Sequence, residues 1–554
     1  MTKQQTAVDA LLKTADAVNP FTSSPAAPLR SFALFDSLGP SLMPRAAVHQ
    51  GMATGLSMLA ADLASAAVDG AIRSFVPPAA SMSVRFGARV AVGAAGAAIA
   101  RLPETDGEKT ARASVRSAGR IVIDAAIGGA IYEAALGLRT RFPGRSPLRP
   151  VTTGLAGFAA SALYARDLLA KRQGMIQRWT EDDTPATLAG SLGIGLGVAA
   201  VGHSIGRGFL ASRRGWIGFF GQDRAHARIG RAFNAATWAA GGVGLYSSVV
   251  AAIARKNEVI EPAYATPPDN PHVSGGSKSG SPFEELGLQG RRYVTDVVTP
   301  DVIEATLGEP AKAHPIRAYI GVNSEPLYPS GRSEMMLDEL ERLGAFERSY
   351  LLLMSPTGTG WVDQAMIDAA EILTRGDIAT ACIQYGRGPS FLEVQKVHLG
   401  RSQFRGLLWG VKMRLQSIPP DQRPTILVFG ESLGAWSSSD VVMHQGIGGF
   451  DHYGIDRALW FGLPGLAKWS KTGMRQGSTD LVPPGTVAAF DRFEQYEELT
   501  LEAREKLRAV VVDHDNDPIA RMSVRLAVKR PEWLAGTERG RGVAATLRWI
   551  PLIT

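Results

Sequence analysis

A series of apolar segments, each about 20 residues long, fills the N-terminal half of the chain and constrains its fold more than any other feature. Alanine and glycine are plentiful in these segments, leucine and isoleucine are sparse, and arginine-rich stretches separate them. Small residues let helices approach closely in a bilayer, where packing drives association. The pattern therefore predicts an α-helical transmembrane bundle of about six spans. Their predicted limits are 47–70, 84–100, 118–138, 151–170, 187–211 and 232–254.

Charged residues inside the predicted spans are the exception to this pattern. A charge that faces lipid costs several kcal/mol, so we expect each of them to point into the bundle or toward an interface. A structural contact between helices is the simpler interpretation, and a polar pathway through the bundle is the alternative. A soluble, alanine-rich helical domain is a second alternative for the whole region. The charged residues are Asp62, Asp69, Arg89, Asp124 and Glu133.

The charge and cysteine content argue against several classes of protein. The net charge of +7 fits arginine in loops beside a membrane, because no basic stretch shows the interleaved aromatics of a nucleic-acid-binding module. Cys382 is the single cysteine, which excludes an internal disulfide and disfavours a thiolate metal cluster. The first 20 residues lack the sustained apolar core of a signal peptide, so we expect the helices themselves to direct the chain to the membrane. We expect no cofactor, no metal and no nucleic-acid partner.

A segment rich in Pro, Gly and Ser, residues 258–282, has no periodic pattern and is predicted to be a linker between domains. It divides the chain into an N-terminal segment (1–46), a helical membrane domain (47–257) and a C-terminal domain (283–554).

The C-terminal domain alternates short β-rich runs with helical patterns, which predicts βαβ units, a mostly parallel sheet and helices on both of its faces. The predicted strands are 317–322, 349–354, 378–384, 425–429, 458–461 and 509–513. The predicted helices include 334–343, 364–374 and a long helix that ends near Arg414.

The strand 425–429 leads directly into Gly430-Glu431-Ser432-Leu433-Gly434, a G-x-S-x-G sequence. A nucleophile elbow needs glycines at these positions because the turn from strand to helix is tight and strained. A second match surrounds Ser204, but it follows a glycine-rich predicted span and no strand precedes it. We therefore predict that Ser432, and not Ser204, is the nucleophile position of an α/β-hydrolase-like domain.

An oxyanion hole requires two backbone N–H groups that point at the developing negative charge. The first is predicted to be the amide of Leu433, which follows the nucleophile. The second is predicted in the loop 355–361 after an earlier strand, at Gly358 or Thr359. The alternative for this loop is a glycine-rich turn without a function.

The acid of such a site follows a late strand, and Asp517 has this position, with Asp513 and Asp515 as neighbouring alternatives. A solvated acidic loop is the structural alternative. The histidine is expected after the acid, but no histidine follows Asp517. His514 is the predicted base, and the remaining candidates are His444 and His452.

Seven runs spread over nearly the whole chain form a recognisable set, namely 37–45, 338–348, 356–361, 384–385, 429–434, 517–518 and 548–551. Together they resemble abhydrolase family nine, bacterial membrane-associated α/β-hydrolases with a multi-pass N-terminal region. The resemblance implies a hydrolase-like domain with Ser432 as nucleophile and Asp517 as acid. It also implies a further C-terminal stretch that carries the histidine, so we expect the family histidine to lie beyond Thr554 and the domain to lack its C-terminal end.

These features predict a multi-pass protein of the cell membrane whose partner is the lipid bilayer. The expected function is that of a serine hydrolase, esterase-like, lipase-like or an acyltransferase, which forms an acyl-serine intermediate on a small-molecule or lipid ester or thioester. The first alternative is a catalytically impaired hydrolase-fold protein with a binding or regulatory role. A transporter that uses the intramembrane charges is the second alternative, and the absence of a clear internal repeat argues against it.

Overall fold

The computed structural model describes residues 24–141, 188–469 and 481–534, apart from 40, 43–44, 46, 78, 105–107 and 257–258, and in addition 540, 543, 547 and 549. The chain divides into two compact units. The first unit comprises Met1–Trp238 together with Val524–Thr554, and the second comprises Ala239–Ser523.

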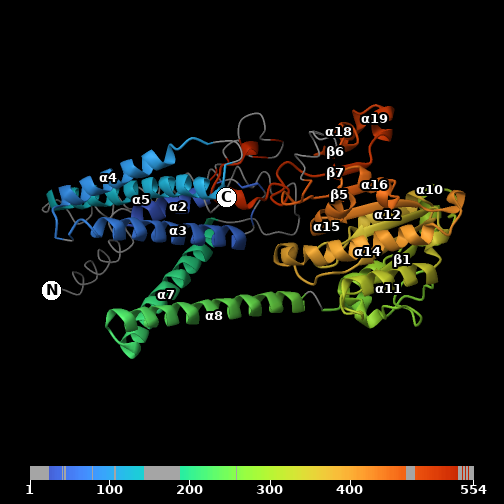
Figure 1. Ribbon diagram of the computed structural model, residues 1–554, viewed down its shortest axis with the longest axis horizontal. Coiled ribbons are helices and arrows are strands. Elements are labelled where there is room, and N and C mark those ends of the chain that lie inside the picture. Colours follow the sequence, from blue (N-terminus) through green and yellow to red (C-terminus); the bar gives the residue numbers. More distant parts are fainter. Residues whose placement is uncertain are drawn as a thin grey trace. The chain divides into compact units, whose positions relative to one another are not determined.

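Long helices build the first unit, and α2, α3, α4 and α5 lie alongside one another (Figure 1). Five of the six predicted spans lie within helices, whereas 151–170 lies outside the described residues. The helices are α2 (Ala27–Ser37), α3 (Ala47–Arg73), α4 (Met82–Ala100), α5 (Thr110–Arg141), α7 (Leu188–Phe220) and α8 (Arg224–Lys256).

Three helices among the described residues are long and apolar enough to cross a membrane, namely Ala47–Arg73, Met82–Ala100 and Gly190–Phe220. They correspond to three of the six predicted spans. The helices α5 and α8 are also long, but arginines occur along both of them, and α5 carries Asp124 and Glu133 in addition. The described part of the chain therefore supports membrane association with a smaller set of candidate spans than the sequence predicted.

Asp62, Asp69, Arg89 and Glu133, four of the five charged residues noted in the predicted spans, form ion pairs between helices. A nitrogen of Arg89 lies 2.7 Å from a carboxylate oxygen of Asp69, and its second terminal nitrogen lies 3.5 Å from Glu133. Arg30 and Asp62 form a further ion pair at 2.6 Å. Pairing lowers the cost of a charge in an apolar environment, so these contacts fit a structural role between helices.

Glycines bring α4 and α5 into backbone contact, as the small-residue pattern predicted. A Cβ atom on Gly119 would lie 2.7 Å from the carbonyl oxygen of Gly96, closer than any ordinary carbon–oxygen contact. Gly87 on α4, in contrast, has nothing within 4 Å of the place that a Cβ would take. There is therefore no room for a side chain where Gly119 meets Gly96.

We predict that Gly119→Ala lowers the stability of the protein by about 1–3 kcal/mol, because the added methyl group separates the two helices. The matched variant Gly87→Ala should leave stability unchanged or raise it, since alanine favours a helix over glycine by about 1 kcal/mol. Thermal unfolding of the full chain in detergent measures both. Equal melting temperatures for the two variants would contradict the close α4–α5 contact.

The second unit is built on a seven-stranded sheet, and all of its strand pairs are parallel. The strand order is β1-β3-β2-β4-β5-β7-β6, which places β4 at the centre. The strands are β1 (Ile316–Ile320), β2 (Tyr350–Ser355), β3 (Ile378–Ile383), β4 (Thr425–Glu431), β5 (Arg457–Phe461), β6 (Val487–Phe490) and β7 (Ala509–Val512). The predicted parallel sheet is confirmed, but β6 was not predicted. It is a four-residue edge strand with two alanines, and alanine is depleted in strands.

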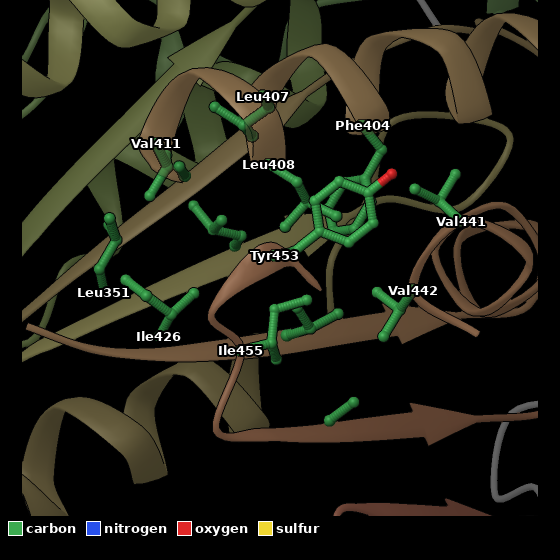
Figure 2. Packing of buried hydrophobic residues seen from close by; sticks show 14 of the residues in the cluster. Leu351, Phe404, Leu407, Leu408, Val411, Ile426, Val441, Val442, Tyr453 and Ile455 are labelled. Atoms are coloured by element: carbon green, nitrogen blue, oxygen red, sulfur yellow. The ribbon is translucent and has the colours of Figure 1, made fainter. Parts of the chain in front are cut away.

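Helices cover both faces of this sheet, as predicted. Buried side chains of α11, α14, α15 and α16 pack on one face, and those of α9 and α12 pack on the other. Figure 2 shows part of the first face, where Leu407 and Val411 of α14 lie over Leu351 and Ile426 of the sheet. The helices are α9 (Gly287–Thr295), α10 (Pro300–Leu307), α11 (Pro329–Arg342), α12 (Gln364–Leu373), α13 (Ser390–Glu393), α14 (Val397–Leu415), α15 (Leu433–Val442), α16 (Gly448–Tyr453), α18 (Phe493–Glu497) and α19 (Leu501–Glu505).

Two stretches at the ends of the α/β domain pack in ways that their composition did not indicate. Part of the predicted linker lies against β1, where the amide of Ser274 donates to the carbonyl of Arg317 at 3.0 Å and Val273 is buried. The stretch Val524–Thr554, assigned to the α/β domain from the sequence, groups with the first unit. There the Arg120 guanidinium lies over the Trp549 ring, 5.1 Å from its centre.

Candidate active site

The predicted site residues follow different strands but meet at one edge of the sheet. Because the strands are parallel, their carboxyl ends all lie at the same edge, where ligands bind in open α/β sheets. Ser432 follows β4, the loop 356–361 follows β2, and Gly462 follows β5. The acidic segment 513–517 follows β7 at the same edge.

Ser432 occupies the turn between β4 and α15 in a strained conformation, with φ of 54° and ψ of −121°. A side chain on Gly434 would overlap the carbonyl oxygen of Ser355 in the neighbouring strand, and a Cβ atom on Gly430 would lie 2.6 Å from the hydroxyl of Ser438. The amide of Ser432 donates to the carbonyl of Phe461 in β5 at 2.9 Å. The G-x-S-x-G spacing thus forms the elbow geometry that it predicted.

One of the two predicted oxyanion elements belongs to this turn, and the other lies in the loop that follows β2. Leu433 is the first residue of α15, and first-turn amides have no acceptor within their own helix. In the loop after β2, the amide of Gly358 donates to the hydroxyl of Ser390 at 3.3 Å. Thr359 has a different environment, because its carbonyl accepts from the Gln384 side chain at 2.8 Å and its hydroxyl lies 3.2 Å from that of Thr357. Of the two predicted loop positions, Gly358 has the amide that points toward the elbow.

Ser390 is a site residue that the sequence analysis did not find. Its hydroxyl accepts a hydrogen bond from the Ser432 hydroxyl at 3.4 Å and another from the Gly358 amide. It lies at the start of α13, after the loop 384–389 that leaves β3. No motif marks this serine, and the only signal is its place after a strand that ends at the same edge.

The three acidic candidates after β7 make different contacts. Asp513 is buried, and its carboxylate accepts from the amide of Leu463 at 2.8 Å. Asp515 forms an ion pair with Arg521 at 3.1 Å. Asp517 accepts from the amide of Ile519 at 2.7 Å, and its second oxygen lies beside Gly462, 3.5 Å from the place that a Cβ would take. Gly462 directly follows the residue that accepts from the Ser432 amide, so Asp517 reaches toward the elbow.

The three histidine candidates lie at different distances from Ser432. His444 lies beyond the far end of α15, and ten helical residues span about 15 Å. His452 stacks on Trp409 with ring centres 5.9 Å apart, and it precedes β5 at the opposite edge of the sheet. His514 lies at the same edge as Ser432, with its side chain 56% exposed and 4.0 Å from the buried carboxylate of Asp491. Of these three candidates, His514 is the one at the catalytic edge.

Glu431 is a second residue that the sequence analysis passed over, although it stands inside the G-x-S-x-G motif. Burial, and secondarily the nearby charge of Asp363, raises the pKa of the Glu431 carboxyl to about 7. One of its oxygens is buried and has no hydrogen-bond partner among the described residues. The carboxyl group next to Ser432 therefore keeps its proton to a higher pH than an ordinary glutamate does.

We predict that Glu431→Gln raises the stability of the protein at pH 8.5 but not at pH 5. A raised pKa means that the folded state binds the proton more tightly than the unfolded chain, so the stabilisation is complete below about pH 4.5 and is lost as the pH rises through about 7. Glutamine resembles the protonated form, so the difference should reach about 3 kcal/mol at high pH.

Unfolding of the full chain at the two pH values measures this difference. The control is Glu502→Gln at an exposed position of α19, which should behave as the wild type at both. A Glu431→Gln variant with the same small effect at pH 5 and pH 8.5 would contradict the assignment.

The parallel sheet, the strained serine after its central strand and the glycine-bearing loop after β2 define the α/β-hydrolase class. Residues 316–554 match the model of abhydrolase family nine, which is described as an alpha/beta-hydrolase family. The predicted family resemblance is confirmed for this part of the chain. No match was found among curated proteins or among solved structures. Among the described residues, no group of three or more His, Cys, Asp or Glu side chains is placed to hold a metal ion.

Proposed function

We propose that the protein is a membrane-anchored serine hydrolase or acyltransferase that acts on an ester or thioester through an acyl-serine intermediate. The observation that carries this proposal is the conformation of Ser432, whose positive φ lifts its hydroxyl out of the sheet edge at the start of α15. Such strain persists only where the surrounding structure enforces it, and it is typical of functional positions.

In this mechanism the Ser432 oxygen attacks the carbonyl carbon of the substrate while its proton passes to a base. The carbonyl oxygen becomes an oxyanion, which the amides of Leu433 and Gly358 stabilise. The C–O or C–S bond to the leaving group then breaks, and the leaving group takes up the proton. Water or an acceptor alcohol attacks the acyl-serine in the second half of the reaction.

We assign the base role to His514 and the orienting acid to Asp517. The support for His514 is its place at the catalytic edge, and the support for Asp517 is its position beside Gly462. Asp491 is a second candidate for the acid, since its carboxylate lies 4.0 Å from the His514 ring nitrogen.

The proposed substrate is a lipid or cell-envelope ester, and the proposed location is the cell membrane with several passes of the chain. Three candidate membrane helices support the location. An apolar cluster of Tyr385, Val397 and Leu433 lies directly beside the nucleophile, and Leu399 and Trp436 pack against it. These three side chains are themselves buried, so they make the surroundings of the nucleophile apolar without being open to a substrate.

A binding or regulatory role is the second candidate. The observation that favours it is the placement of His514, whose ring nitrogen lies 4.0 Å from Asp491 and whose side chain is 56% exposed. If His514 stays in this orientation, it does not take the proton of Ser432.

We predict that a fluorophosphonate probe labels the full chain and that Ser432→Ala abolishes the labelling. The control is Ser204→Ala, because the Ser204 hydroxyl donates to the carbonyl of Ala200 at 2.9 Å within α7. Labelling should persist in this control at the wild-type level. In-gel fluorescence after equal exposure to the probe measures all three proteins.

Labelling that survives Ser432→Ala and disappears in Ser204→Ala would show that the nucleophile is misassigned. If the wild-type protein is folded and remains unlabelled, the binding or regulatory role replaces the hydrolase proposal.

A further inference from the structure

A single hydroxyl connects the nucleophile to the predicted oxyanion loop. The Ser390 oxygen lies 3.4 Å from the Ser432 oxygen and 3.3 Å from the amide nitrogen of Gly358. An oxyanion formed on Ser432 has to lie within hydrogen-bond reach of the same amide, close to the same serine oxygen. The Ser390 hydroxyl is therefore adjacent to the position where negative charge develops during the reaction.

The loop that carries Ser390 is held in place by a buried carboxylate. Glu393 is buried, and its side chain accepts from the amide of Gly388 at 3.0 Å and pairs with Lys396 at 2.9 Å. The loop also lies in backbone contact with the oxyanion loop. A Cβ atom on Gly358 would lie 2.9 Å from both the Gly388 carbonyl oxygen and the Ser390 Cα.

The contact between the two loops fixes the position of the Ser390 side chain. The two loops are fixed against each other, so the Ser390 hydroxyl does not need to be ordered when the substrate binds. Groups that are already in place contribute most to an oxyanion hole, and here the Ser390 oxygen is in place before the reaction, so that only its hydrogen has to turn.

We propose that Ser390 is a third donor of the oxyanion hole, and that its hydroxyl hydrogen bonds to the oxyanion together with the amides of Leu433 and Gly358. In the free protein the hydroxyl accepts from Ser432 and Gly358. When the Ser432 oxygen bonds to the carbonyl carbon, its proton leaves for the base and the carbonyl π electrons move to oxygen. The Gly358 amide then donates to the oxyanion, and the Ser390 hydroxyl rotates to donate as well, since a hydroxyl can do either.

This inference rests on the proposed hydrolase function and names a further catalytic residue of the same site. A hydroxyl that only stabilises the loop would not bind the transition state more strongly than the substrate. A donor to the oxyanion acts mainly in the transition state, so its loss lowers kcat and leaves KM nearly unchanged.

The test compares Ser390→Ala, Ser390→Thr and the control Ser417→Ala, whose hydroxyl donates to the carbonyl of Arg414 at the C-terminal end of α14. Hydrolysis of p-nitrophenyl butyrate by the full chain in detergent gives kcat and KM. Loss of one oxyanion donor should lower kcat by about 10²–10³-fold in Ser390→Ala. Ser390→Thr keeps the hydroxyl and should retain kcat within tenfold, and Ser417→Ala should match the wild type.

A trifluoromethyl ketone provides a second readout, because its adduct with a serine carries an oxyanion. The inhibition constant of the ketone should rise in Ser390→Ala by a factor similar to the loss of kcat/KM. The melting temperature of Ser390→Ala should stay close to that of the wild type. An active wild type with an unchanged kcat in Ser390→Ala overturns the inference and leaves the hydrolase function intact. Equal losses in Ser390→Ala and Ser390→Thr also overturn it. If the wild-type protein shows neither hydrolysis nor probe labelling at Ser432, the hydrolase function and the role of Ser390 are both overturned.

Discussion

The backbone of Ser432 is held at a positive φ, and the arrangement of the α/β domain depends on this one strained turn. Such a conformation costs on the order of 1–3 kcal/mol, so the surrounding packing has to enforce it. The enforcement comes from the centre of the sheet, where Gly434 lies against the Ser355 carbonyl and the Ser432 amide bonds to the strand on the other side. The same turn places Ser432 at the start of α15, so the proposed nucleophile and the proposed oxyanion donor, the amide of Leu433, are positioned together.

In both units, glycines allow secondary-structure elements to pack with their backbones in contact. In the α/β unit, glycines at the elbow allow strand and helix to meet at backbone distance. In the helical unit, Gly96 and Gly119 do the same for α4 and α5, and paired charges such as Arg89 with Asp69 satisfy one another between helices. The segment after Ser523 groups with the helices, so the loop with the candidate acids is joined covalently to the unit that carries the candidate spans.

Much of the α/β domain could be predicted because its strands are buried on both faces and appear as continuous apolar runs such as 350–354. The elbow was predictable because a tight turn restricts residue types at fixed spacing. The edge strand β6 was missed, since four residues with two alanines carry little signal. Ser390 and Glu431 were missed for another reason, because their importance comes from proximity in space and from burial, neither of which has a local pattern. The fourth predicted span, 151–170, lies outside the described residues and stays a prediction.

We propose that Ser432 is a nucleophile whose oxyanion lies between the amides of Leu433 and Gly358. The decisive test is an experimental structure of the full chain after reaction with a phosphonate ester, since the adduct fixes the phosphoryl oxygen where the oxyanion would lie. We predict phosphorus bonded to the Ser432 oxygen, with the phosphoryl oxygen about 2.7–3.1 Å from both amide nitrogens. An adduct on another residue, or a phosphoryl oxygen that points away from both amides, would contradict it.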